Sequence, residues 1–262
     1  MSKKIYTKES IIEKLKEIRE MGWIESGRHG NCGGVGNTLE DLLGIEENNL
    51  PLPNAAEWEL KCQRLDTTSL ITLFHMEPSP TALKFVPCIF LPKYGWEHKY
   101  AGEIYPDTEM SFRQTISCLG RSDRGFKVEV NRKEEKILIS FDENAVAEKH
   151  AKWLESIKLR GCSGELNPQP YWGFQDLYHK AGTKLLNCFF VEAAVKKING
   201  KEHFKYEKIM KLSGFSLQKF LDAIESGYIL IDFDARTGHN HGTKFRLRRN
   251  KFPELYENIE II

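Results

Sequence analysis

Glu59 and Lys61 are the two residues of this sequence whose types and spacing best suit chemistry. They lie in the segment from Glu57 to Cys62, where polar and apolar residues alternate as in a strand, so both side chains project from the same face. A carboxylate can hold Mg²⁺, while a nearby ammonium can orient or activate an attacking water and stabilise charge on a phosphorane. The pair therefore suits metal-dependent hydrolysis of a phosphodiester. An ion pair on an edge strand is the alternative interpretation.

Two further residues could bring oxygen ligands to the same cation. Glu40 lies on a short helix predicted after the glycine-rich loop from Gly30 to Asn37, and Asn54 follows a proline in the turn that enters the strand. Oxygens from a helix, a turn and a strand can converge on one hard cation. Glu40, Asn54 and Glu59 are therefore the predicted metal ligands, and Lys61 completes the predicted catalytic set. Mg²⁺ is the expected cofactor, with Ca²⁺ or Mn²⁺ as substitutes.

A second informative segment runs from Asp232 to Arg246, and it suits contact with nucleic acid. Its glycine-flanked His-Asn-His loop can bring the backbone close to DNA, arginine can read guanine bidentately, and aspartate can accept a hydrogen bond from cytosine. Two alternatives stay open. His239 and His241 could ligate a metal, although no third ligand is evident, or the segment could be a purely structural hairpin. His75, after another predicted strand, could approach DNA or be an exposed turn residue.

The distribution of charge agrees with these two assignments. The 262 residues include 38 Lys and Arg against 37 Asp and Glu, a net charge of +1, which excludes a protein that is basic throughout. Residues 38–60 nevertheless hold six acidic residues and no basic ones, whereas residues 235–252 hold six Lys or Arg and no acid. The acidic segment suits a divalent cation, and the basic segment suits a polyanion.

These two segments resemble a known group of nucleases. The string from Gly34 to Gly44, followed by Pro-x and Glu-x-Lys, resembles the MutH-like branch of the PD-(D/E)xK nucleases, and the MvaI/BcnI restriction endonucleases in particular. The string from Asp232 to Arg246 resembles the DNA-recognition lobe of the same enzymes, and the similarity runs from about Trp23 to the C-terminus. The resemblance implies that seven residues of this string contact bases or phosphates, namely Asp232, Asp234, Arg236, His239, His241, Lys244 and Arg246.

The resemblance implies a Mg²⁺-dependent type II restriction endonuclease that hydrolyses phosphodiesters in duplex DNA at a short site of the CC-x-GG type. It further implies a monomer that acts on one strand at a time and that pairs functionally with a DNA methyltransferase. Two alternatives stay open. One is a strand-nicking mismatch-repair endonuclease of the MutH kind, and the other is a catalytically inactive protein that binds specific DNA sequences.

Asn54 departs from the nuclease pattern, because the acid of the PD motif falls at this position. An amide keeps a neutral oxygen ligand but loses the charge that binds Mg²⁺, which weakens the metal site. The asparagine could be a substitution that inactivates an active enzyme, a feature of a degenerate family member, or a sign that Glu57 supplies the acid. The otherwise intact motif favours the first interpretation.

The predicted elements mix strands and helices without strict βαβ alternation, which indicates an α/β or α+β fold with a mixed central sheet flanked by helices. The resemblance implies a restriction-endonuclease-like core with a second lobe for DNA recognition. We predict a catalytic lobe over residues 1–110 and a recognition lobe over residues 111–262. Helices are predicted at 7–21, 37–43 (with Asn37 or Thr38 as the cap), 145–157 and 216–226. Strands are predicted at 57–62, 69–74, 86–91, 126–131, 136–141, 188–198, 204–210, 229–233 and 244–247.

The composition indicates a globular cytoplasmic protein. Hydrophobic residues make up 40% of the chain, yet no apolar run approaches the length of about 18 residues that a membrane span needs. The N-terminal residues also lack the apolar stretch of a secretory signal. The six cysteines occur singly and are expected to be free thiols, with Cys62 and Cys188 buried in strands. Cys62, next to Lys61, lacks the paired histidine that a nucleophile needs. Arg113 and Arg121 could bind phosphate, although solvated surface is the expected role.

Overall fold

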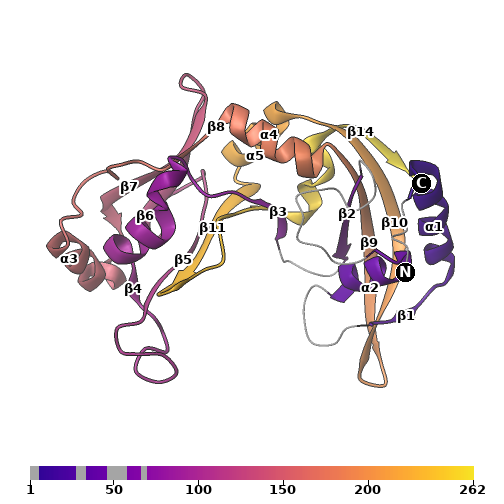
Figure 1. Ribbon diagram of the computed structural model, residues 1–262, viewed down its shortest axis with the longest axis horizontal. Helices are drawn as coiled ribbons and strands as arrows, with labels where there is room; N and C mark the ends of the chain where they lie inside the picture. The colour runs from indigo at the N-terminus through magenta and orange to yellow at the C-terminus, as the bar shows by residue number, and fades with distance from the viewer. Residues whose placement is uncertain (1–5, 28–33, 46–57, 66–69) are drawn as a thin grey trace. The chain divides into compact units, whose positions relative to one another are not determined.

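The computed structural model describes residues 6–27, 34–45, 58–65 and 70–262, apart from the side chain of Arg249. The chain forms two compact units, each built from segments that are distant in the sequence (Figure 1). The first unit comprises the described residues among 1–71, 181–216 and 248–262, and the second comprises those among 72–180 and 217–247. Both units draw on residues from either side of residue 110, and the roles predicted for the two lobes stay predictions.

Among the described residues, the first unit contains a five-stranded sheet with the order β1-β10-β9-β2, in which β14 also pairs with β10. β2 runs parallel to β9, whereas the other pairs are antiparallel. The predicted mixed sheet is therefore confirmed. The strands are β1 (Ile24–Glu25), β2 (Glu59–Arg64), β9 (Asn187–Ile198), β10 (Lys201–Phe215) and β14 (Tyr256–Ile261).

β9 and β10 form the long hairpin that Asn199-Gly200 predicts. Asn199 (φ 52°) and Gly200 (φ 79°) both take the left-handed backbone conformation that a two-residue type I′ turn requires. β9 also pairs along its other edge with β2. The hairpin therefore fixes the position of the strand that carries Glu59 and Lys61.

Two helices, α1 (Lys8–Glu20) and α2 (Gly34–Leu43), pack their apolar sides into the core of the first unit. α1 confirms the predicted N-terminal helix. It begins with a capping box between Thr7 and Ser10, in which each side chain satisfies a backbone donor of the other residue. α2 begins earlier than the sequence predicts.

The start of α2 corrects the prediction of a glycine-rich loop that continues to Asn37. Val35 and Leu39 lie about one turn apart and are both buried, and the Tyr206 hydroxyl donates to the Val35 carbonyl at 2.9 Å. The Thr38 hydroxyl accepts a hydrogen bond at 3.2 Å from the backbone of the preceding segment and does not cap the helix. Burial of Val35 and its hydrogen bond offset the helical cost of the neighbouring glycines.

Among the described residues, the second unit contains a six-stranded sheet with the order β3-β13-β11-β5-β4, and the short β12 pairs with β11. β11 is central and runs antiparallel to both β13 and β5. The strands are β3 (Ile71–His75), β4 (Trp96–Glu97), β5 (Met110–Ile116), β11 (Ile229–Arg236), β12 (His239–Asn240) and β13 (Lys244–Leu247).

A separate three-stranded antiparallel sheet in the second unit has the order β6-β7-β8 and contains the hairpin predicted at 126–131 and 136–141. Its strands are β6 (Arg124–Asn131), β7 (Lys136–Val146) and β8 (Tyr171–Gly173). The other α-helices of the described chain are α3 (Ala151–Leu159), α4 (Phe174–Leu185) and α5 (Leu217–Glu225), and short 3₁₀ turns lie at Thr81–Leu83, Glu148–His150, Arg249–Lys251 and Pro253–Leu255.

The apolar segment predicted as a strand at residues 86–91 is instead part of a π-helix, Val86–Tyr94. A short apolar run does not distinguish a buried strand from a buried helix. Pro87 of this segment and Pro92 directly after it lack the backbone donor that a central strand needs. The ring of Phe90 stacks on Phe112 of β5 with centroids 4.7 Å apart, so the helix covers the inner side of the six-stranded sheet.

The helix predicted at residues 145–157 also begins later than expected. β7 continues to Val146, which pairs with Arg124 of β6, and α3 starts only at Ala151. Cross-strand pairing therefore outweighs helical propensity in residues 145–146.

The cysteines of the described residues are free thiols, as predicted: Cys62, Cys88, Cys118, Cys162 and Cys188. Cys188 is buried, whereas Cys62 is only half-buried. None of the helices in the described ranges combines the length and the apolar character needed to cross a membrane.

Candidate catalytic site and nucleic-acid interface

Glu59 and Lys61 lie on the same face of β2, as their spacing predicts. The Lys61 ammonium donates to Glu59 Oε1 at 3.1 Å. The Glu59 side chain is only 8% exposed and that of Lys61 is 21% exposed. The pair is therefore largely shielded from water. Electrostatic interactions are stronger in such a place than on an open surface.

The second carboxylate oxygen of Glu59 is the unusual feature of this pair. Glu59 Oε2 is buried, and no donor in the described part of the chain contacts it. A buried carboxylate oxygen without a partner is costly, so such an atom calls for a ligand. A divalent cation would supply one, because carboxylate oxygens are the preferred ligands of Mg²⁺. The buried Oε2 atom of Glu59 therefore fits the predicted metal site.

Two protonated groups line Glu59. The parallel register of β2 and β9 places Cys188 opposite Glu59. Burial raises the pKa of the Cys188 thiol, an effect that the nearby Lys61 ammonium only partly opposes. Burial also raises the pKa of Tyr256 well above its usual value, with Cys188 and Glu59 adding to the rise. Both groups are uncharged at neutral pH, and a protonated thiol is a poor nucleophile.

Glu40 lies half-buried on α2, as predicted, and its charge acts on Cys62 of β2. Burial raises the pKa of the Cys62 thiol, and the Glu40 carboxylate raises it further. Cys62 follows Lys61 directly, so its side chain projects from the other face of β2.

The remaining predicted ligand, Asn54, and its alternative, Glu57, lie outside the described residues. Within the described ranges, no three His, Cys, Asp or Glu side chains form a group that could hold a metal. The structure thus brings Glu59 and Lys61 together, and the full ligand set of Glu40, Asn54 and Glu59 stays a prediction.

In the second unit, β11 presents one apolar and one polar face. Burial alternates residue by residue from Ile229 to Arg236, and every second side chain is buried. We call the outward side chains of β11, with their polar neighbours on β5 and β13, the β11 polar face: Asp232, Asp234, Arg236, Arg113, Thr115, Lys244 and Arg246. Five of these residues are among the predicted DNA contacts.

Asp234 holds two cations of the β11 polar face. Its Oδ1 accepts from Arg113 Nε at 2.7 Å, and its Oδ2 accepts from Lys244 Nζ at 3.1 Å. Burial by itself would raise the pKa of Asp234, but the bonds from Arg113 and Lys244 outweigh this effect and lower it. The same bond to Asp234 raises the pKa of Arg113. Asp234 is therefore ionised at neutral pH and fixes both cations in place.

Asp232 is paired in the same way. Its Oδ1 accepts from the Thr115 hydroxyl at 2.9 Å, and its Oδ2 accepts from Arg246 Nη1 at 3.3 Å. Lys244 lies opposite Asp232 in the register but reaches diagonally to Asp234. The β11 polar face is thus an ordered lattice of opposite charges, of the kind that can present donors and acceptors to the base edges of DNA.

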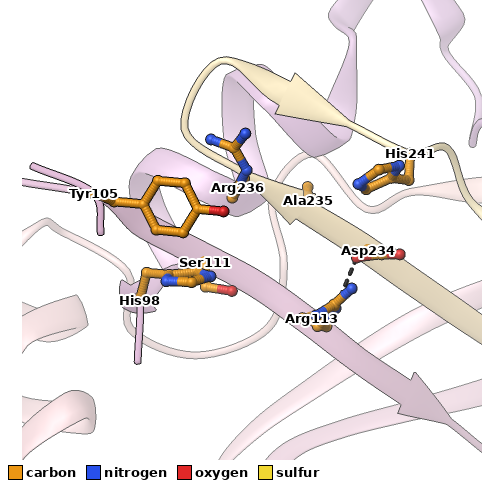
Figure 2. A pocket seen from close by; sticks show the side chains of 8 residues that line it. All are labelled: His98, Tyr105, Ser111, Arg113, Asp234, Ala235, Arg236 and His241. Atoms are coloured by element: carbon orange, nitrogen blue, oxygen red, sulfur yellow. Dashed lines mark hydrogen bonds and ion pairs between the residues drawn. The ribbon is translucent and has the colours of Figure 1, made fainter. Parts of the chain in front are cut away.

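Arg236 lies at one end of this face, beside an open surface pocket of about 130 Å³ (Figure 2). Its guanidinium donates from Nη1 to Glu109 Oε1 at 2.9 Å and lies over the ring of Tyr105, 4.6 Å from the centroid. In Figure 2 the pocket is bordered by Tyr105 and Arg236 on one side and by the ion pair of Arg113 with Asp234 on the other.

The predicted His-Asn-His loop follows β11. The rings of His239 and His241 meet edge to face with centroids 4.3 Å apart. Glu77 anchors the loop, because its Oε1 accepts from the Thr243 backbone N–H at 2.9 Å. A third ligand that would support the alternative of a histidine metal site is absent from the described residues.

His75 lies beside this loop. It is the exposed last residue of β3, and a Cβ added to Gly242 would come within 3.2 Å of its ring. Gly242 itself has a left-handed backbone (φ +81°), which a residue with a side chain adopts only under strain. The fold therefore places His75 next to the predicted DNA-contacting loop.

Several residues of the interface were not predicted as contacts. Arg113 is 62% exposed, in keeping with the expected surface role, but it is also ion-paired at the centre of the face. Glu77, Tyr105 and Glu109 escaped notice because they act through contacts with residues more than 100 positions away. Alternation in residues 111–115 could have indicated the polar side of β5. Arg121 instead serves the structure, since it donates to a backbone carbonyl at 2.9 Å.

The α+β fold, with a mixed sheet that presents an acid and a lysine from one strand, is that of the restriction-endonuclease-like nucleases. The comparison with protein families is more specific. The model of the MvaI/BcnI restriction endonuclease family matches residues 12–256, and the chain belongs to this family. The resemblance inferred from the sequence is thereby confirmed.

Two solved structures show the extent of the similarity. The first, a complex of restriction endonuclease MvaI with its cognate DNA substrate, shares 25% sequence identity over 96% of each chain, with a TM-score of 0.74. The second, MvaI in the absence of DNA, shares 24% identity over 99% of each chain, with a TM-score of 0.56, and supports the fold alone. A comparison with curated proteins found no match.

Proposed function

We propose that this protein is a divalent-metal-dependent type II restriction endonuclease that cuts duplex DNA at a short specific site. The observation that carries the proposal is the buried Glu59–Lys61 pair, with its unpartnered carboxylate oxygen, in a chain that belongs to a restriction endonuclease family. Mg²⁺ is the proposed cofactor, and Ca²⁺ and Mn²⁺ are the proposed substitutes.

In the proposed reaction, water attacks phosphorus in line with the departing 3′ oxygen. Glu59, Glu40 and the residue at position 54 would hold Mg²⁺, which supplies positive charge and acidifies water when bound. The Lys61 ammonium, held by Glu59 at 3.1 Å, can donate to the attacking water and to a phosphoryl oxygen. Glu59 is buried, as are Cys188 and Tyr256, so bulk water has little access to the carboxylate.

Asn54 sets the expected strength of this activity. An amide at this position supplies a neutral oxygen, so we expect weak metal binding and slow cleavage in the chain as it stands. Aspartate at position 54 would restore the missing charge. A catalytically inactive DNA-binding protein is a second candidate function, and Asn54 is the observation that favours it.

Duplex DNA is the proposed substrate. The similar MvaI structure is a complex with cognate DNA, and the β11 polar face of this chain offers cationic and acidic groups in fixed register. We propose a target of the CC-x-GG type, a monomeric enzyme and a partner DNA methyltransferase. The predicted contacts Asp232, Asp234, Arg236, Lys244 and Arg246 lie on this face, with His239, His241 and His75 beside it.

The test is cleavage of supercoiled plasmid with Mg²⁺ and with EDTA. The unchanged protein and Asn54→Asp are compared, and Glu59→Gln in the Asn54→Asp background is the matched control. We expect linear product from Asn54→Asp with Mg²⁺ alone, and its sequenced ends would give the site. Only nicked circles would support the MutH-like alternative. If neither form cuts yet both retain a specific duplex, the inactive DNA-binding protein is supported and the nuclease proposal fails.

A further inference from the structure

Arg236 is held from two directions by the connection between β4 and β5. Its Nη1 donates to Glu109 Oε1 at 2.9 Å, and its guanidinium lies over the Tyr105 ring at 4.6 Å from the centroid. The Glu109 side chain is only 6% exposed, whereas that of Arg236 is 35% exposed. A buried carboxylate thus fixes one nitrogen of a guanidinium whose remainder reaches the surface.

The connection that carries Glu109 and Tyr105 is itself tied down. The Glu109 N–H donates to the Pro106 carbonyl and its own carbonyl accepts from the His98 N–H, both at 2.9 Å. His98 and Tyr105 meet edge to face with ring centroids 4.8 Å apart. These contacts hold both residues in one arrangement around the arginine.

The strand end is bonded to the same connection. The Thr237 N–H donates to the Met110 carbonyl at 3.0 Å, and the Met110 N–H donates to the Thr237 hydroxyl at 2.9 Å. The backbone on either side of the Arg236–Glu109 pair is therefore locked in register. The arginine and its carboxylate partner cannot drift apart without breaking these bonds.

This arrangement selects which part of Arg236 can take a ligand. Within the described residues, Nη1 is the guanidinium nitrogen with a protein acceptor, so the edge formed by Nε and Nη2 keeps its donors for a ligand. One face of the group is covered by Tyr105, and the open pocket lies beside it (Figure 2). A planar pair of donors matches the N7 and O6 acceptors of guanine.

We propose that Glu109 and Tyr105 are positioning residues that hold Arg236 for bidentate recognition of one guanine in the target site. The inference rests on the proposed function, since it assumes that the β11 polar face binds DNA. Holding the side chain before binding avoids part of the ordering cost of a flexible arginine. Arg113 provides the contrast, because it is 62% exposed and its carboxylate partner, Asp234, is shared with Lys244.

The experiment measures binding of duplexes that carry the mapped cleavage site, in Ca²⁺, with single guanines replaced by 7-deazaguanine. This replacement removes one acceptor, N7, and keeps the base pair. We expect the unchanged protein to lose about 10-fold affinity at one particular guanine, since a hydrogen bond to a charged group contributes about 1.5 kcal/mol or more. Arg236→Ala should abolish the sensitivity at that position.

The positioning variants give the decisive comparison. Glu109→Gln and Tyr105→Leu should bind the unmodified duplex more weakly and lose most of the 7-deazaguanine effect at the same guanine as Arg236→Ala. Tyr105→Phe keeps the ring and should retain the effect. Glu103→Gln, an exposed acid in the same connection, is the matched control and should behave as the unchanged protein.

The outcomes separate the two proposals. If Glu109→Gln or Tyr105→Leu remains folded and keeps the full effect at that guanine, the positioning role is wrong while the nuclease proposal stands. If Glu109→Gln does not fold, the result for Tyr105→Leu alone decides whether Arg236 is positioned in this way. If the unchanged protein and Asn54→Asp bind all duplexes with equal affinity, both the proposed function and this inference are overturned.

Discussion

The catalytic pair on β2 and the β11 polar face both place charged side chains on one face of a strand, but they balance charge in opposite ways. On β11, polar side chains lie at every second residue over a buried apolar face, whereas on β2 the polar residues Glu59 and Gln63 are themselves buried. Glu59 has one buried oxygen that no donor in the described chain contacts. Asp232 and Asp234, in contrast, each have both oxygens occupied by neighbouring donors.

This difference separates a site that requires a ligand from a surface that is complete without one. An unsatisfied buried oxygen makes a cation part of the working site. A compensated face can exist before DNA arrives, and each carboxylate oxygen can accept a second hydrogen bond without releasing the first. Loss of a charge at the catalytic site should therefore greatly lower the cleavage rate. Loss of a charge on the β11 polar face should mainly lower the discrimination between DNA sequences.

The largest effect is expected at the catalytic pair. In the Asn54→Asp background, Glu59→Gln or Lys61→Ala should slow cleavage by roughly 100-fold or more, because each removes a charge aimed at the reacting phosphate. Single-turnover cleavage rates measure this effect, and duplex affinity in Ca²⁺ should stay within a few-fold for Lys61→Ala. Glu13→Gln on the exposed side of α1 is the control. A rate within a few-fold of the control would remove the pair from the mechanism.

Phe233→Ala tests whether the apolar side of β11 supports the polar one. Phe233 is fully buried against Phe90 and Phe112, and truncation of such a ring costs about 3–5 kcal/mol. Hydrogen exchange should show lost protection in β5 and β11 and a smaller loss in β9 and β10. Equal losses in all four strands would contradict the separation into two compact units.

Asp234→Asn should weaken specificity more than affinity. The change removes the carboxylate that Arg113 and Lys244 share, so the net charge of the face rises by one. A more positive face favours binding to any phosphate backbone, whatever the base sequence. We expect roughly 10-fold more cleavage at single-base variants of the site, as loss of one base contact predicts. Asp222→Asn, at an ion pair with Arg132 elsewhere in the second unit, is the matched control. Unchanged discrimination would place base recognition elsewhere.

The smallest effect concerns pH. Arg113 and Lys244 lower the pKa of Asp234 below its ordinary value of 3.8. The ionised Asp234 should therefore stabilise the fold above pH 3.8, and this stabilisation should be lost as the pH falls through the lower pKa of the folded state. A carboxyl-detected NMR titration should show Asp234 ionised throughout the range from pH 5 to 9. Arg113→Ala should shift the midpoint upward. A midpoint above 3.8 in the unchanged protein would show that burial, not pairing, dominates.

Local patterns account for what the sequence predicted correctly. A period of two placed Glu59 and Lys61 on one face, and the Asn199-Gly200 turn identified the hairpin. These features depend on neighbours in the chain. Family resemblance then supplied the class of enzyme.

Long-range packing accounts for what the sequence could not predict. Arg113 and Glu109 reach their partners on β11 across more than 100 residues, and only the cross-strand register brings them together. The apolar segment at 86–91 became part of a π-helix because Pro87, the following Pro92 and the stacking of Phe90 outweighed its strand-like composition. α2 begins before the predicted start because Val35 is buried in the core.

The most direct test of the central claim is a calorimetric titration of Ca²⁺ into the protein bound to a duplex that carries the mapped site. We predict a saturable site in Asn54→Asp, weaker binding in the unchanged protein, and loss of the site when Glu59→Gln is added to Asn54→Asp. These results would make the open oxygen of Glu59 a metal ligand. Identical Ca²⁺ binding with and without the Glu59 carboxylate would contradict the account.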